Sequence, residues 1–348
     1  MQHLLKLIKT ETVLSIAVIL AAVSAVFVHP DGQYIQYIDF RTLALLFCLM
    51  TVIAGIRRRG VFSVLAARLV SRSKNTAGMV TALVLASFFL SMLITNDVSL
   101  ITLVPLTMNC FERLPEEDRK NWLIPGVVLE TVAANLGSMT TPVGNPQNLY
   151  LYGLSDLTLF SFLKIILPYS MISLILLLLW IRVHQISGRH YSDKPRELLR
   201  SGCGKISSEA INGNENPATG SDSSTPAIHS NGLAAYFALF ALCLATVARL
   251  VPWPVPFAAV LIYVFLSDRK TIYEADYSLL GTFLALFIFI GNLGRIPSFR
   301  SALSGVLTGH EVFTAIAASQ VMSNVPAAIL LSGFTSKTDL LIIGTNLG

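Results

Sequence analysis

The residues best suited to binding a small solute lie between Asn135 and Asn148, in a run that reads NLGSMTTPVGNPQN. The run holds two Gly, two Pro and three Asn, and a continuous helix does not favour such residues, because Pro lacks a backbone donor and Gly adds conformational entropy. It lies between apolar segments that look able to cross a membrane, where each freed N–H and C=O needs a partner in protein or beside a wet cavity. The run therefore predicts a binding site at membrane depth, and the alternative is a surface loop between two helices.

Polar residues of similar type interrupt two other apolar blocks. Thr95, Asn96 and Asp97 interrupt residues 77–111, and Ser323 and Asn324 interrupt a block in the second half. The Asn carbonyl can coordinate a hard cation while its amide donates to an oxyanion. Where a helix restarts, free N–H groups and the positive end of the helix dipole can hold a carboxylate without a fixed cation. These breaks contain no Lys or Arg, and they predict sites for a cation and a small anion.

Asp97 and Glu130 are the acidic residues that lie well inside apolar runs. Because an intramembrane acid is costly, a functional role is the default interpretation. For Asp97 that role is a cation ligand or proton carrier, and the alternative is an N-cap for a helix that begins at Val98. Glu130 precedes Asn135 by about one helical turn and is either a proton site or a structural bond to a neighbouring hairpin.

The composition indicates a polytopic, all-α membrane protein. Hydrophobic residues make up 53% of the chain and charged residues 13%, against roughly a quarter charged in a soluble domain, and the mean hydropathy is +0.66. The net charge of +5 comes from short Lys and Arg clusters between apolar runs, which are typical of loop anchors and argue against nucleic-acid binding. The four cysteines have no CxxC spacing, so neither a disulfide framework nor a metal centre is predicted. No HExxH, GxSxG or paired-acid spacing suggests an enzyme, and no cofactor is expected.

Charge asymmetry predicts the topology. An uncleaved first span covers residues 12–28, and a second, residues 40–56, ends at three consecutive arginines, which places the N-terminus in the cytoplasm and residues 29–39 outside. Residues 61–70 are too short to span and suit a helix in the cytoplasmic interface. Residues 77–111 are either two full spans or a re-entrant hairpin; we favour the hairpin, because each arm has about 14 to 18 residues and a crossing needs about 20.

The chain divides into an N-terminal membrane half (1–186), a flexible cytoplasmic linker rich in Ser, Asn and Gly (187–232) and a C-terminal membrane half (233–348). The second half repeats the order of the first: Asn324 corresponds to Asn96, and residues 346–348 correspond to residues 135–137. Counting crossings predicts two inverted repeats, each with a re-entrant hairpin and a discontinuous helix, as in many secondary transporters. This topology puts Arg295 and Arg300 outside, against the positive-inside trend. We expect that the second discontinuous helix continues beyond Gly348 in a longer parent protein.

TNDVSLITLVPLT (95–107), ANLGSMTTPVGNPQN (134–148), SNVPAA (323–328) and the final GTNLG together resemble the ion transporter superfamily, which includes divalent anion/sodium symporters, citrate permeases and arsenite permeases. The resemblance covers nearly the whole chain outside the linker. It implies Na⁺- or H⁺-coupled transport of a small anion across the plasma membrane, with di- or tricarboxylates ahead of inorganic oxyanions. Arsenite efflux and Na⁺/H⁺ exchange are the alternatives within the superfamily, and a channel and a membrane-embedded enzyme are remote ones. The expected partners are the small anion and the lipid bilayer, and a homodimer is left open.

The resemblance also implies roles for individual residues. Asn96 and Asn324 match the asparagines of Ser-Asn-Thr tip motifs, whereas Asp97 and Val325 replace the motif threonines, and an Asn-Asp tip is more like the arsenite permeases. The candidate substrate contacts are Asn96, Thr141, Asn145, Asn148, Ser323 and Asn324, although Ser and Thr in membrane helices often bond only their own backbone. The candidate cation ligands are Thr95, Asn96, Asp97, Asn135, Gly137, Asn324 and Asn346, and the proton-coupling candidates are Asp97 and Glu130.

Overall fold

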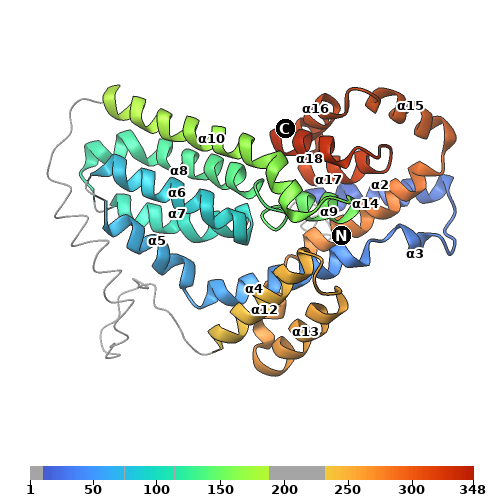
Figure 1. Ribbon diagram of the computed structural model, residues 1–348, viewed down its shortest axis with the longest axis horizontal. Helices are drawn as coiled ribbons and strands as arrows, with labels where there is room; N and C mark the ends of the chain where they lie inside the picture. Colours follow the sequence, from blue (N-terminus) through green and yellow to red (C-terminus); the bar gives the residue numbers. More distant parts are fainter. Residues whose placement is uncertain (1–10, 74, 113, 188–231) are drawn as a thin grey trace, which may run out of the picture. The chain divides into compact units, whose positions relative to one another are not determined.

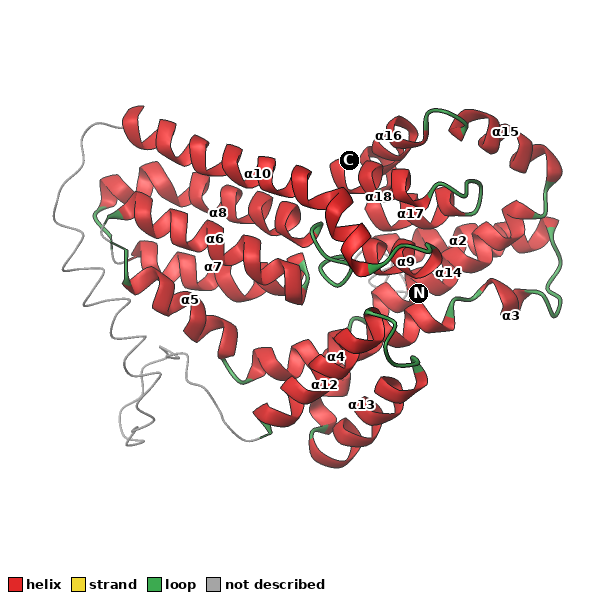
Figure 2. Cartoon of the chain, viewed as in Figure 1, coloured by secondary structure: helices red, strands yellow, loops and turns green. Residues whose placement is uncertain are grey.

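The computed structural model describes residues 11–73, 75–112, 114–187 and 232–348 (Figure 1). Within these ranges every regular element is a helix and no strand is present (Figure 2). In the part of the chain that the structure describes, four helices are long and apolar enough to cross a membrane: α4 (Phe40–Arg58), α6 (Thr76–Ile94), α10 (Leu159–Ser187) and α14 (Tyr277–Gly294). The prediction of an all-α polytopic membrane protein is therefore confirmed. The predicted linker lies almost wholly outside the described residues.

The helices form two compact units that do not follow the order of the chain. Among the described residues, one unit comprises those within 1–51, 146–165 and 242–348, and the other comprises those within 52–145 and 166–241. The three predicted domains were drawn from sequence order, and their boundaries stay a prediction. We describe each unit by itself below.

The unit of residues 52–145 and 166–241 is built around α6. This helix begins after Asn75, whose side-chain oxygen accepts a hydrogen bond from the Gly78 amide at 2.8 Å and so caps the first turn. Helices α5 (Val61–Ser71), α7 (Asn96–Glu112) and α8 (Glu116–Ser138) all pack against α6. Large side chains such as Phe88, Phe111 and Trp122 are fully buried among these helices, so α6 and its neighbours share one apolar core.

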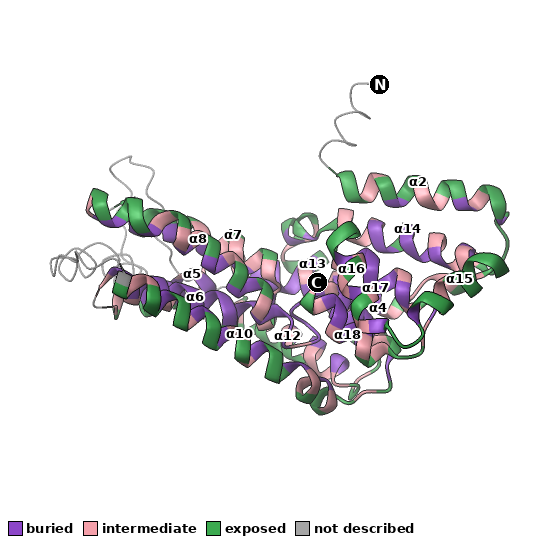
Figure 3. Cartoon of the chain, turned by 90° about the horizontal axis from the view of Figure 1, so that it is seen from above, coloured by how far each residue is buried: buried purple, intermediate pink, exposed green. Residues whose placement is uncertain are grey.

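The other unit holds the N-terminal helices and most of the second half of the chain. Its elements are α2 (Thr12–Phe27), α3 (Tyr34–Tyr37), α9 (Pro146–Leu154), α13 (Pro254–Ser267), η1 (Arg269–Glu274), α14, α15 (Pro297–Leu307), α16 (Glu311–Met322), α17 (Asn324–Ser332) and α18 (Thr338–Leu347). Helix α12 (Leu233–Val247) contributes its last turns. Helix α2 packs along α14, and α17 packs against α9, α14 and α18. Figure 3 shows that α2 is exposed along much of its length, which suits a helix on a lipid-facing surface.

Helices α2 and α14 run in the same direction. The hydroxyl of Ser278, at the start of α14, donates to the Glu11 carboxylate just before α2. Near the other end, the buried amide of Asn292 donates to the Ser24 hydroxyl at 3.0 Å and to the Tyr34 hydroxyl at 2.9 Å. The two starts therefore lie on one side and the two ends on the other, in agreement with the predicted order of crossings.

Arg295 follows α14 and pairs with the segment between α2 and α4. Its Nη1 lies 2.8 Å from the Asp31 Oδ2 and 3.2 Å from the Tyr37 hydroxyl. Arg295 and residues 29–39 thus lie on the same side of the protein, as predicted from counting crossings. Which side of the membrane this is stays a prediction from charge.

Candidate functional site

Each predicted hairpin corresponds to two helices separated by one residue, and the two tips have the same backbone conformation. Because α6 is long and apolar enough to cross a membrane, the choice between a re-entrant hairpin and two full spans stays a prediction for the first of them. Helices α6 and α7 are separated by Thr95 alone, with φ 69° and ψ 153°, and α16 and α17 are separated by Ser323 alone, with φ 70° and ψ 165°. A positive φ with an extended ψ is nearly restricted to glycine, so each tip is strained. The conformation turns the chain in one residue and restarts a helix at Asn96 and at Asn324.

The discontinuous helix is also present. Helix α8 ends at Ser138, α9 begins at Pro146, and residues 139–145 between them are turns. The Thr141 hydroxyl donates to the Met92 carbonyl of α6 and accepts from the Gly144 amide at 3.1 Å, so this side chain satisfies backbone groups that the break leaves free. The surface-loop alternative is therefore wrong, because Thr140, Val143, Gly144 and Asn145 are all buried.

Asn96 and Asn135 form the centre of the first group of candidate residues. The Asn96 amide Nδ2 donates to the Asn135 Oδ1 at 2.7 Å, and the Asn135 Nδ2 donates to the Thr131 carbonyl at 3.1 Å. Gly137 follows Asn135 by two residues, and a Cβ built there would meet the Phe88 carbonyl at 2.1 Å. The absence of a side chain at Gly137 thus allows α8 to approach α6 closely beside the first tip.

Asp97 and Glu130 belong to the same unit, in different environments. Asp97 lies exposed in the first turn of α7, where its carboxylate complements the helix dipole. Helix α7 begins at Asn96, two residues earlier than the capping alternative assumed, so Asp97 lies within its first turn. Glu130 is fully buried: its Oε1 accepts from the Thr107 hydroxyl at 2.7 Å, and its buried Oε2 has no hydrogen-bond partner among the described residues. This contact joins the second arm of the first hairpin to α8.

The second group of candidate residues lies in the other unit and includes the restart of the broken helix. Asn346, near the end of α18, donates from Nδ2 to the Asn148 Oδ1 at 2.6 Å and to the Ile342 carbonyl at 2.7 Å. Its own Oδ1 is buried and has no hydrogen-bond partner in the described parts of the chain. Asn148 is fully buried in the first turns of α9, and Tyr150 from the same helix shares a 3.0 Å hydrogen bond with Ser332 of α17. Helix α9 is thus fixed against the second hairpin.

The glycines of the two matched segments make equivalent contacts. A Cβ at Gly137 would meet the Phe88 carbonyl and the Ser91 hydroxyl, and a Cβ at Gly348 would meet the Ile316 carbonyl and the Ser319 side chain. Phe88 and Ile316 each precede their hairpin tip by seven residues, and Ser91 and Ser319 each precede it by four. The correspondence of residues 135–137 with residues 346–348 is therefore visible in the packing as well as in the sequence.

Arg249 is a positioning residue that the sequence did not single out. Its Nη2 donates to the Tyr152 carbonyl at 3.1 Å and to the Ser155 carbonyl, and its guanidinium lies 5.1 Å from the centre of the Tyr152 ring. The last carbonyls of α9 lack helical partners, and a cation there also complements the helix dipole. The available signal was an isolated arginine between two apolar runs of the second half.

The candidate residues thus form two groups, each within one unit. Thr95, Asn96, Asp97, Glu130, Asn135, Gly137, Thr141 and Asn145 belong to one unit, and Asn148, Ser323, Asn324 and Asn346 belong to the other. Each group combines amide and carbonyl oxygens with a restarting helix. Such a combination can coordinate a hard cation through oxygen and hold an oxyanion through backbone N–H groups.

Comparison with known proteins places the chain in a family. Residues 5–338 match the model of a family described as "Citrate transporter". The inner membrane protein YbiR of Escherichia coli is 30% identical over 89% of this chain and 76% of its own length. An uncharacterized transporter of Methanocaldococcus jannaschii is 26% identical over 91% of this chain and 78% of its own length. A silicon efflux transporter of rice is 32% identical over 43% of this chain and 30% of its own length.

The family match covers the spans, both hairpin tips and the broken helix. Together with the apolar helices, this match shows that the protein is a multi-pass membrane transporter. The chain belongs to the citrate transporter family.

Proposed function

We propose that this protein is a secondary active transporter that moves a small anion, preferably a di- or tricarboxylate, across the plasma membrane with Na⁺ or H⁺ as the coupling ion. The observation that carries the proposal is the bond between Asn96 and Asn135, which joins a strained hairpin tip to the end of a broken helix. Neither tip motif nor the run from Asn135 to Asn148 contains Lys or Arg. A substrate carboxylate would therefore be held by helix N-termini and amides instead of a fixed cation.

Oxygen atoms at both groups suit the coupling cation. The Asn96 amide is the donor to Asn135, so the carbonyl oxygen of Asn96 remains for coordination. In the second group, the buried Asn346 Oδ1 lacks a hydrogen bond within the described chain, and a buried acceptor without a partner is costly. A bound Na⁺ would satisfy that oxygen. Asn135, Gly137, Asn324 and the residues of the first tip would supply further oxygens in this proposal.

We infer two inverted repeats, each of which supplies candidate ligands. The two tips share a backbone conformation, and the glycines of the two matched segments contact hairpin residues at the same offsets from the tip. These observations support the repeat architecture predicted from the sequence. Thr141, Asn145, Asn148 and Ser323 would then contact the substrate, and the N-terminus and linker would face the cytoplasm.

Glu130 is the candidate for proton coupling inside the protein. We expect the substitution Glu130→Gln to keep the hydrogen bond from the Thr107 hydroxyl, because the Gln carbonyl still accepts it. The substitution removes the carboxyl group that could carry a proton. If Glu130 carries the coupling proton, this variant loses uptake driven by a proton gradient. Thr107→Val serves as the matched control, because it removes the bond and keeps the acid. Proton-driven uptake at the wild-type rate in Glu130→Gln would assign Glu130 a structural role.

Efflux of an inorganic oxyanion is the second candidate function. It is favoured by Asp97 in the first turn of α7 and by the similarity to a protein named as a silicon efflux transporter. A carboxylate at the tip would disfavour a multiply charged organic anion more than a neutral or weakly ionised solute.

Uptake into proteoliposomes separates these candidates. The purified protein would be tested with labelled citrate, succinate and arsenite, each under an imposed Na⁺ gradient, an imposed proton gradient and neither. We expect concentrative uptake of citrate or succinate that stops when an ionophore collapses the gradient. Transport of arsenite alone would favour the second candidate, and equilibration that ignores both gradients would indicate a channel.

A further inference from the structure

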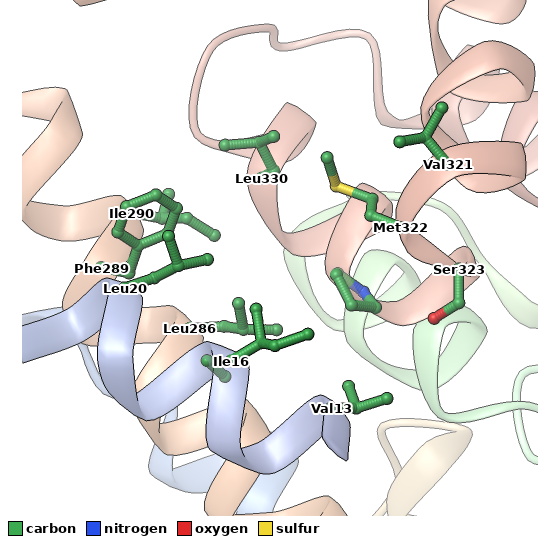
Figure 4. Close-up of a pocket in the computed structure, with 12 residues that line it drawn as sticks. Val13, Ile16, Leu20, Leu286, Phe289, Ile290, Val321, Met322, Ser323 and Leu330 are labelled. Carbon is green, nitrogen blue, oxygen red and sulfur yellow. The ribbon is translucent and has the colours of Figure 1, made fainter.

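An apolar cavity of about 450 Å³ lies within the unit that contains the second hairpin. Its walls come from α2, α14 and the hairpin of α16 and α17 (Figure 4). Both α2 and α17 pack against α14, and the cavity lies where side chains of α2 and of the hairpin face each other across it. The hairpin side reaches the strained tip, because Met322 and Ser323 line it.

The lining does not suit a hydrophilic anion. Among the lining side chains Ser323 is the sole polar one, and the others are aliphatic or aromatic residues, Met and Pro. A water cluster would also lack the two to four polar partners that a buried water needs. The cavity therefore shares Ser323 with the second group of candidate residues, and the rest of its lining is apolar, unlike that group.

The cavity is continuous with the surface that meets the bilayer. Ile16 on α2 is 53% exposed and Val321 on the hairpin is 85% exposed, and both line the cavity. Further along α2, Ile19, Val23 and Val26 are also exposed. In a multi-pass membrane protein, such side chains face lipid, so an acyl chain can enter the cavity from the surface without crossing a polar region.

We propose that this cavity binds one acyl chain of a membrane phospholipid. Its volume lies within the range of about 300 to 1,000 Å³ that is usual for ligand pockets. A filled cavity regains the dispersion contacts that an empty one loses, and in a bilayer the acyl chain is the abundant group of matching polarity. The bound chain lies against Met322, Ser323 and Pro326 and holds the second hairpin in place against α14.

The test is photolabelling of the purified, reconstituted protein with a phosphatidylcholine that carries a diazirine on one acyl chain. We expect crosslinks, mapped by mass spectrometry, to concentrate on peptides from α2 and from residues 321–330. Ile16→Trp fills the cavity from α2, and Ile19→Trp is the matched control on the same helix, with similar exposure but outside the cavity. Ile16→Trp should lower labelling of the hairpin about fivefold, and Ile19→Trp should leave it within about twofold.

A second variant, Leu330→Trp, fills the cavity from the hairpin and should have the same effect as Ile16→Trp if both variants are folded. Labelling spread evenly over exposed helices such as α10, or labelling unchanged in both cavity variants, would overturn the proposal. Absence of label from residues 321–330 in a protein that elutes as a dimer would also overturn it, because a second copy would then be the occupant. The result does not depend on which anion or ion the protein transports.

Discussion

Thr95 and Ser323 hold the same unusual backbone conformation, although neither is a glycine. Residues in this region cost about 1 to 3 kcal/mol each, and they persist only where the surrounding structure determines them. At both positions the following residue is an asparagine that opens a new helix. The strained residue thus lies at the point where each new helix begins.

Asp97→Asn tests whether the charge at the first tip is needed for coupling. The substitution preserves the shape of the side chain and removes a negative charge from the first turn of α7. We expect folded protein whose gradient-driven uptake falls about tenfold or more, which corresponds to about 1.4 kcal/mol. Circular dichroism and size-exclusion chromatography check the fold, and proteoliposome uptake gives the rate. Wild-type coupled uptake would remove Asp97 from the coupling mechanism.

Asn96→Ala and Asn324→Ala test the two tips. Each substitution removes an amide that opens a helix at a hairpin tip, and Asn96→Ala also breaks the 2.7 Å bond to Asn135. We expect both variants to lose transport. Asn109→Ala is the control, because Asn109 is an exposed asparagine on α7 away from the tip. If both tip variants keep the wild-type dependence on Na⁺, the asparagines are not ligands of the coupling ion.

The elements around each tip are fixed by close backbone approach. Gly137 lets α8 approach the Phe88 carbonyl of α6, and Gly348 lets the end of the chain approach the Ile316 carbonyl of α16. In each case the asparagine two residues before the glycine bonds to another asparagine. Helix packing therefore determines the positions of the candidate ligand side chains.

Gly137→Ala tests this close approach. An added Cβ would lie 2.1 Å from the Phe88 carbonyl oxygen, so α6 and α8 must separate, and overpacking of this kind costs about 1 to 3 kcal/mol. Gly126→Ala is the matched control on the same helix, because its Cβ would meet the Phe111 ring at 3.5 Å, an ordinary contact. We expect a lower apparent melting temperature and reduced transport in Gly137→Ala alone. Equal melting temperatures would show that the contact relaxes without cost.

At the scale of the whole molecule, the family membership and the apolar helices describe a multi-pass membrane transporter. Its two compact units each combine segments that are distant in the sequence, since α9 packs with α17 and α18 instead of following α8. Within one unit, the parallel α2 and α14 and the pair of Arg295 with Asp31 fix the relative order of crossings. Which side faces the cytoplasm is a prediction from charge.

The native cysteines allow the predicted orientation to be tested without introducing new cysteines. Cys48, Cys110 and Cys243 are buried thiols, whereas Cys203 belongs to the predicted cytoplasmic linker. In cells with an intact membrane, we expect an impermeant maleimide to leave the protein unmodified, and in inside-out vesicles we expect it to modify one site. Cys203→Ser should abolish the reaction. Modification of Cys203 from the outside would invert the topology.

The sequence by itself predicted the main apolar helices, a polar interruption in each of two apolar blocks, and a helix break within residues 135–148. These features follow from local composition, because Gly, Pro and Asn in an apolar run disfavour continuous helix wherever the chain is placed. The prediction placed the first tip at residues 95–97 and the second break within residues 322–328, and the structure narrows each to a single residue, Thr95 and Ser323.

Only the tertiary structure decided which polar groups meet. The repeat in the sequence makes Asn346 the equivalent of Asn135. It does not show that the Asn346 amide donates to Asn148, 198 residues away. Nor does it show that Arg249 binds the end of α9. The contact of Glu130 with Thr107 and the apolar cavity beside Ser323 likewise depend on how helices are rotated against one another. That rotation is set by packing over the whole unit, and composition within a single segment does not encode it.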